Sequence, residues 1–162
     1  MIVYLDSSAL VKLFVCESGT EPVQRIAASS RVQVTSEPAY VEIRSALARR
    51  EREGTIDRSD FSALLREFDE AWSGFFLIPL DRHPLHEAGD LEQGHRLRAY
   101  DAIHLAAGLR WRRGRGSPPR LLVLIGRSSR RRPPSICTGS KSSNLKGRES
   151  PFTWVLRRRL CR

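Results

Sequence analysis

Short apolar runs rich in β-branched and aromatic residues alternate along the chain with longer segments in which apolar residues recur at helical spacing. The short runs are typical of buried parallel strands, and they lie at residues 2–5, 32–35, 75–80 and 121–125. The longer segments predict helices at about residues 7–15, 20–28, 38–53, 57–72, 84–92 and 99–111. Because no hairpin signal joins the strands, the pattern predicts an α/β fold with parallel pairing through right-handed crossovers.

One apolar stripe is long enough to identify a packed helix face. The stripe recurs at helical spacing and consists of Phe61, Leu64, Leu65, Phe68 and Trp72. We expect it to contribute to the core or to a dimer contact.

The net charge of +10 belongs to the last third of the chain. Residues 1–109 carry 12 Lys and Arg against 17 Asp and Glu, whereas residues 110–162 carry 16 against one. A basic surface suggests nucleic acid as a partner, but most of the chain is mildly acidic. A length of 162 residues suits one domain with a sizeable core.

The regular pattern ends at Ile125, so we assign residues 1–125 to the folded domain and residues 126–162 to an Arg-, Ser- and Pro-rich tail. Two explanations of the tail stay open. It is either a disordered RNA-binding segment or the product of a change of reading frame between residues 110 and 126, which the abrupt loss of acidic residues suggests. The coding DNA would decide between them.

The sequence predicts a cytoplasmic protein with no membrane insertion. No basic stretch precedes the first apolar run, and Asp6 interrupts that run, which argues against a signal peptide. No apolar stretch approaches the roughly 20 residues that span a bilayer. The three cysteines form neither a CxxC pair nor an even set, which favours a reducing compartment.

Three acidic residues interrupt apolar sequence at separate places: Asp6, Glu42 and Asp101. Desolvating a carboxylate is costly unless it meets a cation, so three of them bordered by core-forming residues indicate a metal site. Carboxylates bind hard ions such as Mg²⁺ or Mn²⁺. Asp6 follows the first strand, Asp101 opens the last predicted helix, and Glu42 lies early in a long helix. Such positions can meet in one crevice at the carboxyl ends of parallel strands.

A site of this kind favours metal-dependent hydrolysis of a phosphodiester. A bound ion can lower the pKa of a water that attacks phosphorus in line, while a second ion steadies the leaving oxygen. Ser7 or Ser8 can bond a carboxylate or a phosphate oxygen beside the ion.

Each acid also has a purely structural explanation. Asp6 can cap the helix that follows it, and Asp101 can be a first-turn acid stabilised by the helix dipole. Glu42 can pair with Arg49 or Arg50 on a solvated face. The joint occurrence of the three acids, each in an apolar setting, is what favours a metal site.

The remaining titratable residues are weaker candidates. His104 has no partner at metal-ligand spacing, so we expect a packed histidine or one that supports a ligand. Asp81 is expected at a turn or a helix cap. His83, His86 and His95 form no HExxH pattern and are expected at the surface.

At these residues the sequence resembles the PIN-domain ribonucleases, in particular the VapC-type toxins of toxin–antitoxin pairs. The matching segments are the opening VYLDSSALVK, the VEIR segment within residues 36–47, and DAIHLA, and each contains one of the three acids. Their order and separation also fit, so the resemblance covers roughly residues 1–125.

The resemblance implies a three-layer α/β/α sandwich with a mostly parallel sheet, and cleavage of RNA with Mg²⁺ or Mn²⁺. It makes Asp6, Glu42 and Asp101 the metal ligands and catalytic residues, and it implies a homodimer and a cognate antitoxin. Family members commonly have a fourth acid after the strand that matches residues 121–125, where this chain has Gly126-Arg127-Ser128-Ser129.

The missing acid predicts weakened activity, because fewer carboxylates hold an ion less tightly. The last strand and helix of the fold also lack a clear counterpart. The alternative function is therefore a catalytically impaired PIN remnant, or a non-catalytic RNA-binding protein that uses the basic tail.

Overall fold

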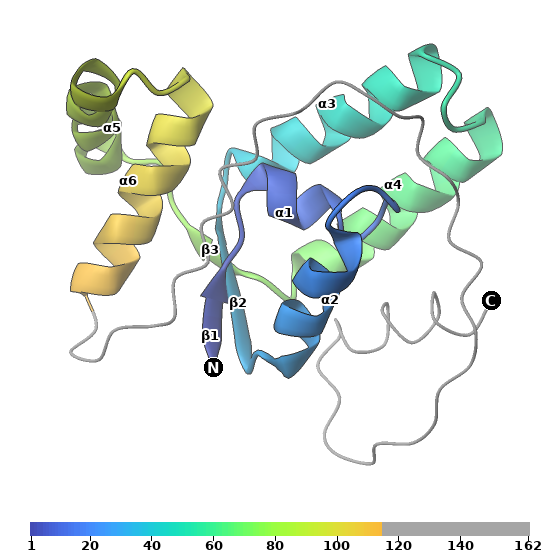
Figure 1. Ribbon diagram of the computed structural model, residues 1–162, viewed down its shortest axis with the longest axis horizontal. Helices are drawn as coiled ribbons and strands as arrows, with labels where there is room; N and C mark the ends of the chain where they lie inside the picture. Colours follow the sequence, from blue (N-terminus) through green and yellow to red (C-terminus); the bar gives the residue numbers. More distant parts are fainter. Residues whose placement is uncertain (115–162) are drawn as a thin grey trace.

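The computed structural model describes residues 1–114. The predicted strand at residues 121–125, the position of the missing fourth acid and the basic tail lie outside the described residues. Within residues 1–114 the elements follow one another (Figure 1) as β1 (Ile2–Tyr4), α1 (Ser7–Val11), α2 (Thr20–Ser29), β2 (Val32–Ser36), α3 (Ala39–Arg52), α4 (Arg58–Trp72), β3 (Phe76–Ile78), α5 (Arg82–His95) and α6 (Ala99–Arg113).

The three described strands form one parallel sheet in the order β1-β2-β3. Tyr4 lies opposite Val34 across the first pair, and Val34 lies opposite Phe76 across the second. Helices connect the strands, which a parallel sheet requires because its strands cannot be joined by tight turns. The predicted parallel pairing is confirmed for these strands.

Alternation along β1 divides the molecule into layers, because successive side chains of a strand point to opposite faces. Val3 and Leu5 are buried in the larger hydrophobic cluster with residues of α1 to α4. Tyr4 points the other way and packs with Val34 and with Ala107 of α6. Figure 1 shows α1 to α4 on one side of the sheet and α5 and α6 on the other. The α/β sandwich is therefore confirmed.

The predicted stripe on α4 is part of the larger cluster. Phe68 is fully buried, and its ring lies 5.5 Å from that of Phe14 in an edge-to-face arrangement. Leu64 is also buried, while Phe61 and Trp72 are partly buried against the same cluster. Within this chain, the stripe therefore packs into the core.

Two helices differ in length from the prediction. The first helix ends at Val11, because the backbone continues through tighter turns in which Leu13 bonds to Leu10 and Phe14 to Val11. These turns place consecutive apolar side chains in the core, which a regular helix would turn to different faces. Conversely, α5 begins before residue 84 and runs to His95.

Among residues 1–114, no helix combines the length and the apolar character that crossing a bilayer requires.

Candidate metal centre

Asp6 lies directly after β1, at the point where the chain turns into α1. Its backbone is extended, and its carboxylate accepts hydrogen bonds from the Ala9 amide at 2.8 Å and from the Ser8 hydroxyl at 2.9 Å. The residue is only 5% exposed. Asp6 therefore caps α1, and this capping hydrogen bond fixes one carboxylate oxygen at the carboxyl end of the sheet.

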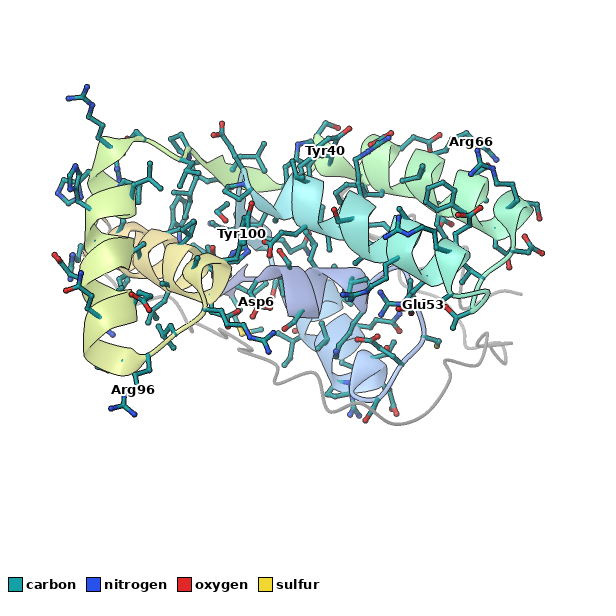
Figure 2. The ribbon with its side chains drawn as sticks, turned by 90° about the horizontal axis from the view of Figure 1, so that it is seen from above. Asp6, Tyr40, Glu53, Arg66, Arg96 and Tyr100 are labelled. Carbon is teal, nitrogen blue, oxygen red and sulfur yellow. The ribbon has the colours of Figure 1, made fainter. Side chains whose placement is uncertain are left out.

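Asp101 lies in the first turn of α6. Figure 2 shows Asp6 at the start of α1, facing the end of α6 that carries Tyr100, the neighbour of Asp101. Burial raises the pKa of Asp6, and the negative charge of Asp101 raises it further. The structure therefore brings these two acids within electrostatic reach of each other.

Glu42 lies in the first turn of α3, and it does not form the surface ion pair that helical spacing allows. Its Oε2 atom accepts hydrogen bonds from the Ser7 hydroxyl at 2.5 Å and from Nε2 of His104 at 2.7 Å. Arg50 instead donates to Glu17, also at 2.5 Å. The carboxylate of Glu42 is thus turned toward α1 and α6, next to the residue that follows Asp6.

His104 joins most of the segments around these acids. Its Nε2 atom contacts Glu42 and lies 2.9 Å from the Ser7 hydroxyl. Its Nδ1 atom lies 2.9 Å from the Tyr4 hydroxyl and 3.1 Å from the Ser36 hydroxyl. The residue is 3% exposed, so the expectation of a packed histidine is confirmed, while support of a metal ligand stays a prediction.

The donor chemistry at this end of the sheet fits a hard divalent ion. The negative charge of Asp101 acts on the buried carboxylate of Asp6, and a cation would relieve that repulsion. Within residues 1–114, however, no three His, Cys, Asp or Glu side chains converge closely enough to hold one ion. Asp6, Glu42 and Asp101 as a complete ligand set therefore stay a prediction.

Sequence reasoning missed two members of the polar cluster. Tyr4 lies in a short apolar run and Ser36 directly follows the second predicted strand, so neither pattern indicates a polar site. Their hydroxyls reach His104 only through the pairing of the strands in the sheet. Burial raises the pKa of Tyr4 above its usual range, so its hydroxyl keeps its proton. A polar group in an otherwise buried strand was the available signal, since such a group needs a partner.

The weaker candidates lie away from this cluster. Asp81 caps α5 by accepting a hydrogen bond from the His83 amide, and it pairs with Arg110 at 2.8 Å. Its expected role as a cap is confirmed. His83, His86 and His95 are exposed, as expected.

Comparison with known proteins places this chain in a family. Residues 3–110 match the PIN domain. Ribonuclease VapC45 of Mycobacterium tuberculosis strain CDC 1551 / Oshkosh and Ribonuclease VapC49 of strain ATCC 25618 / H37Rv are both 32% identical over 108 residues. The match covers 67% of this chain and 75% of each relative. The chain belongs to the VapC-type PIN-domain family.

This PIN domain is also similar to a solved structure. A toxin–antitoxin complex from Klebsiella pneumoniae matches with a TM-score of 0.52 and 21% identity, over 68% of this chain and 80% of that chain. At 21% identity this similarity supports the fold alone. The three acids all lie within the segment that matches the PIN domain.

Proposed function

We propose that this VapC-type PIN-domain protein is a metal-dependent endoribonuclease and the toxin of a toxin–antitoxin pair. The observation that carries the proposal is the buried Asp6 carboxylate at the carboxyl end of a parallel sheet, beside the hydrogen-bonded side chains of Ser7, Glu42 and His104. The similarity to proteins named ribonucleases supports RNA as the substrate. Asp6, Asp101 and Glu42 would hold Mg²⁺ or Mn²⁺.

When bound, a divalent ion supplies a Lewis acid that lowers the pKa of a water and balances negative charge on a phosphate. Residues of the chain orient the carboxylates that would bind this ion. Asp6 is oriented by the Ala9 amide and the Ser8 hydroxyl, so one of its oxygens is held in position. Glu42 is oriented by Ser7 and His104 in the same way. These contacts reduce the reorganisation that ligand binding would otherwise require.

Membership of the VapC-type family supports a cognate antitoxin and a homodimer as part of the same proposal. The described body of the protein is not strongly basic, since residues 1–109 carry more acidic than basic side chains. Binding of RNA by the body would therefore depend on local cations and on the bound divalent ion, which screens the acids from the phosphates.

The test is an RNA cleavage assay with a titration of Mg²⁺ or Mn²⁺, comparing the wild type with Asp101→Asn. We expect cleavage that requires the ion, stops on addition of EDTA and falls by about 10- to 100-fold or more in the variant. Cleavage that survives EDTA, or that Asp101→Asn retains, would contradict the metal mechanism.

A non-catalytic RNA-binding protein would give a different result in the same experiment. It would bind RNA without a divalent ion, and its affinity would fall steeply with added salt because phosphate contacts release counterions. Binding with that salt dependence and no cleavage at any ion concentration would favour this alternative.

A further inference from the structure

The buried imidazole of His104 is the structural centre of the polar cluster, although the proposed reaction assigns it no step. Its ring contacts side chains from β1, α1, β2 and α3, while the residue itself belongs to α6. Any buried histidine needs polar partners for its ring nitrogens, but one partner here is the carboxylate of Glu42, a predicted metal ligand. The arrangement therefore calls for a role that depends on where the ring points.

The two ring nitrogens face different kinds of partner. Glu42, when ionised, can only accept hydrogen bonds, so Nε2 of His104 must carry the proton of their 2.7 Å contact. On the other side, the Tyr4 and Ser36 hydroxyls lie within hydrogen-bonding distance of Nδ1. Hydroxyl groups of β1 and β2 thus contact Nδ1 of His104, and Nε2 donates to the carboxylate of Glu42.

Both donors to Glu42 act on the same oxygen. The Ser7 hydroxyl and Nε2 of His104 each bond to Oε2. Among residues 1–114 no hydrogen bond is made to Oε1, so this is the oxygen that remains for a ligand, and its position follows once Oε2 is held. A single flexible glutamate on the first turn of a helix would otherwise sample several rotamers, which weakens ligand binding.

We infer that His104 is a positioning residue, which, with its ring held by Tyr4 and Ser36, fixes the Glu42 carboxylate for a divalent cation. The inference rests on the proposed function, in which Glu42 is a ligand of the divalent ion. Groups that orient metal ligands in this way typically change metal affinity or activity by about 10- to 100-fold when removed.

The experiment measures the affinity of the full chain for Mn²⁺ without RNA, by titration with detection of free Mn²⁺, and thermal unfolding without metal. His104→Leu removes the donor and replaces the ring with an apolar side chain of similar bulk. His104→Gln can keep an N–H donor near the position of Nε2. Thr35→Val is the matched control, because it removes a buried hydrogen bond to the Leu5 carbonyl in the same sheet and touches neither Glu42 nor His104.

We expect His104→Leu to weaken Mn²⁺ binding by about tenfold or more, His104→Gln to recover part of the loss, and Thr35→Val to bind as the wild type does. In a Glu42→Gln background, His104→Leu should change Mn²⁺ affinity little, because its effect passes through the carboxylate. Its effect on thermal unfolding should persist there. Equal Mn²⁺ affinities for His104→Leu and Thr35→Val would overturn the inference.

A second variant keeps the inference testable if His104→Leu does not fold. The double substitution Tyr4→Phe with Ser36→Ala removes both hydroxyls beside Nδ1 and leaves His104 and Glu42 in place. We expect weaker Mn²⁺ binding from this variant, and unchanged binding would count against the inference. A wild type without Mn²⁺ affinity and without cleavage would instead overturn the proposed function, and this inference with it.

Discussion

Burial raises the pKa of Asp6, and the charge of Asp101, which lies on an element at the opposite end of the described chain, raises it further. The larger contribution is burial, which disfavours the charged carboxylate of Asp6. The Ala9 amide and the Ser8 hydroxyl act in the opposite direction but do not cancel it. The metal-free protein thus holds a carboxylate whose ionisation costs stability.

Replacing Asp6 should reveal this cost. A carboxyl group with a raised folded-state pKa stabilises the fold at pH values below the ordinary aspartate pKa, and that contribution is lost as the pH rises through the raised value. Asp6→Asn keeps a side-chain acceptor at the helix cap and removes the charge. In EDTA at neutral pH, we expect it to melt at a higher temperature than the wild type. Thermal unfolding across pH checks this expectation.

Asp57→Asn is the matched control for that substitution. Asp57 also caps a helix, α4, but hydrogen bonds from the Asp60 amide and Ser59 lower its pKa. Its ionised form therefore stabilises the fold above the ordinary aspartate pKa, and the contribution is lost as the pH falls through the lowered value. At neutral pH the control should melt no higher than the wild type. An equal rise in melting temperature in Asp6→Asn and Asp57→Asn would show that burial and the charge of Asp101 are not the cause of the gain in Asp6→Asn.

Addition of a divalent ion should reverse the stability order of wild type and Asp6→Asn. A ligand that binds only the folded state stabilises it by about 2.7 kcal/mol at 100 times its dissociation constant. We expect Mg²⁺ or Mn²⁺ to raise the melting temperature of the wild type in a concentration-dependent manner, and to raise that of Asp6→Asn much less. Differential scanning fluorimetry with and without EDTA makes the comparison. Identical shifts would mean that Asp6 does not hold the ion.

Truncation of Phe68 should cause one of the largest losses of stability in the described core. The fully buried ring packs against Phe14, Tyr40 and Trp72 at centroid distances of 5.5, 5.5 and 5.3 Å. We expect Phe68→Ala to lower the free energy of unfolding by about 3–5 kcal/mol. Leu85→Ala, at a side chain that is 45% exposed, should have much less effect in the same denaturant titration.

Glu17 links three segments through two ion pairs, so its charge should matter for stability. Its carboxylate contacts Lys12 at 2.6 Å and Arg50 at 2.5 Å, and all three side chains are at most 25% exposed. Glu17→Gln leaves two cations without their partner, and we expect a loss of about 1–2 kcal/mol, allowing for partial solvent screening. Glu21→Gln is the control, because the Glu21–Arg25 pair is largely exposed. If Glu17→Gln and Glu21→Gln lower the free energy of unfolding equally, water replaces Glu17 as a partner of Lys12 and Arg50, and the expectation is wrong.

Much of the fold was readable from local patterns, because the signals involved act over a few residues. The stripe that contains Phe68 identified α4 and its buried face. Gly54 follows α3 with a φ of +67°, a conformation that glycine adopts without steric cost. Element ends were read less well where packing overrides propensity. The early end of α1 is an example, because Leu13 and Phe14 must both reach the core.

The sequence by itself determined that Asp6, Glu42 and Asp101 border core-forming segments, because strand and helix periodicity already placed them at element ends. Tertiary structure alone decided which groups each acid meets. Parallel pairing and the packing of α6 on the sheet bring His104 to Tyr4 and Ser36, and turn Glu42 inward rather than toward Arg49 or Arg50. Hydrogen bonds and charge interactions depend on distances in space, and no local pattern records the distance between residues far apart in a chain.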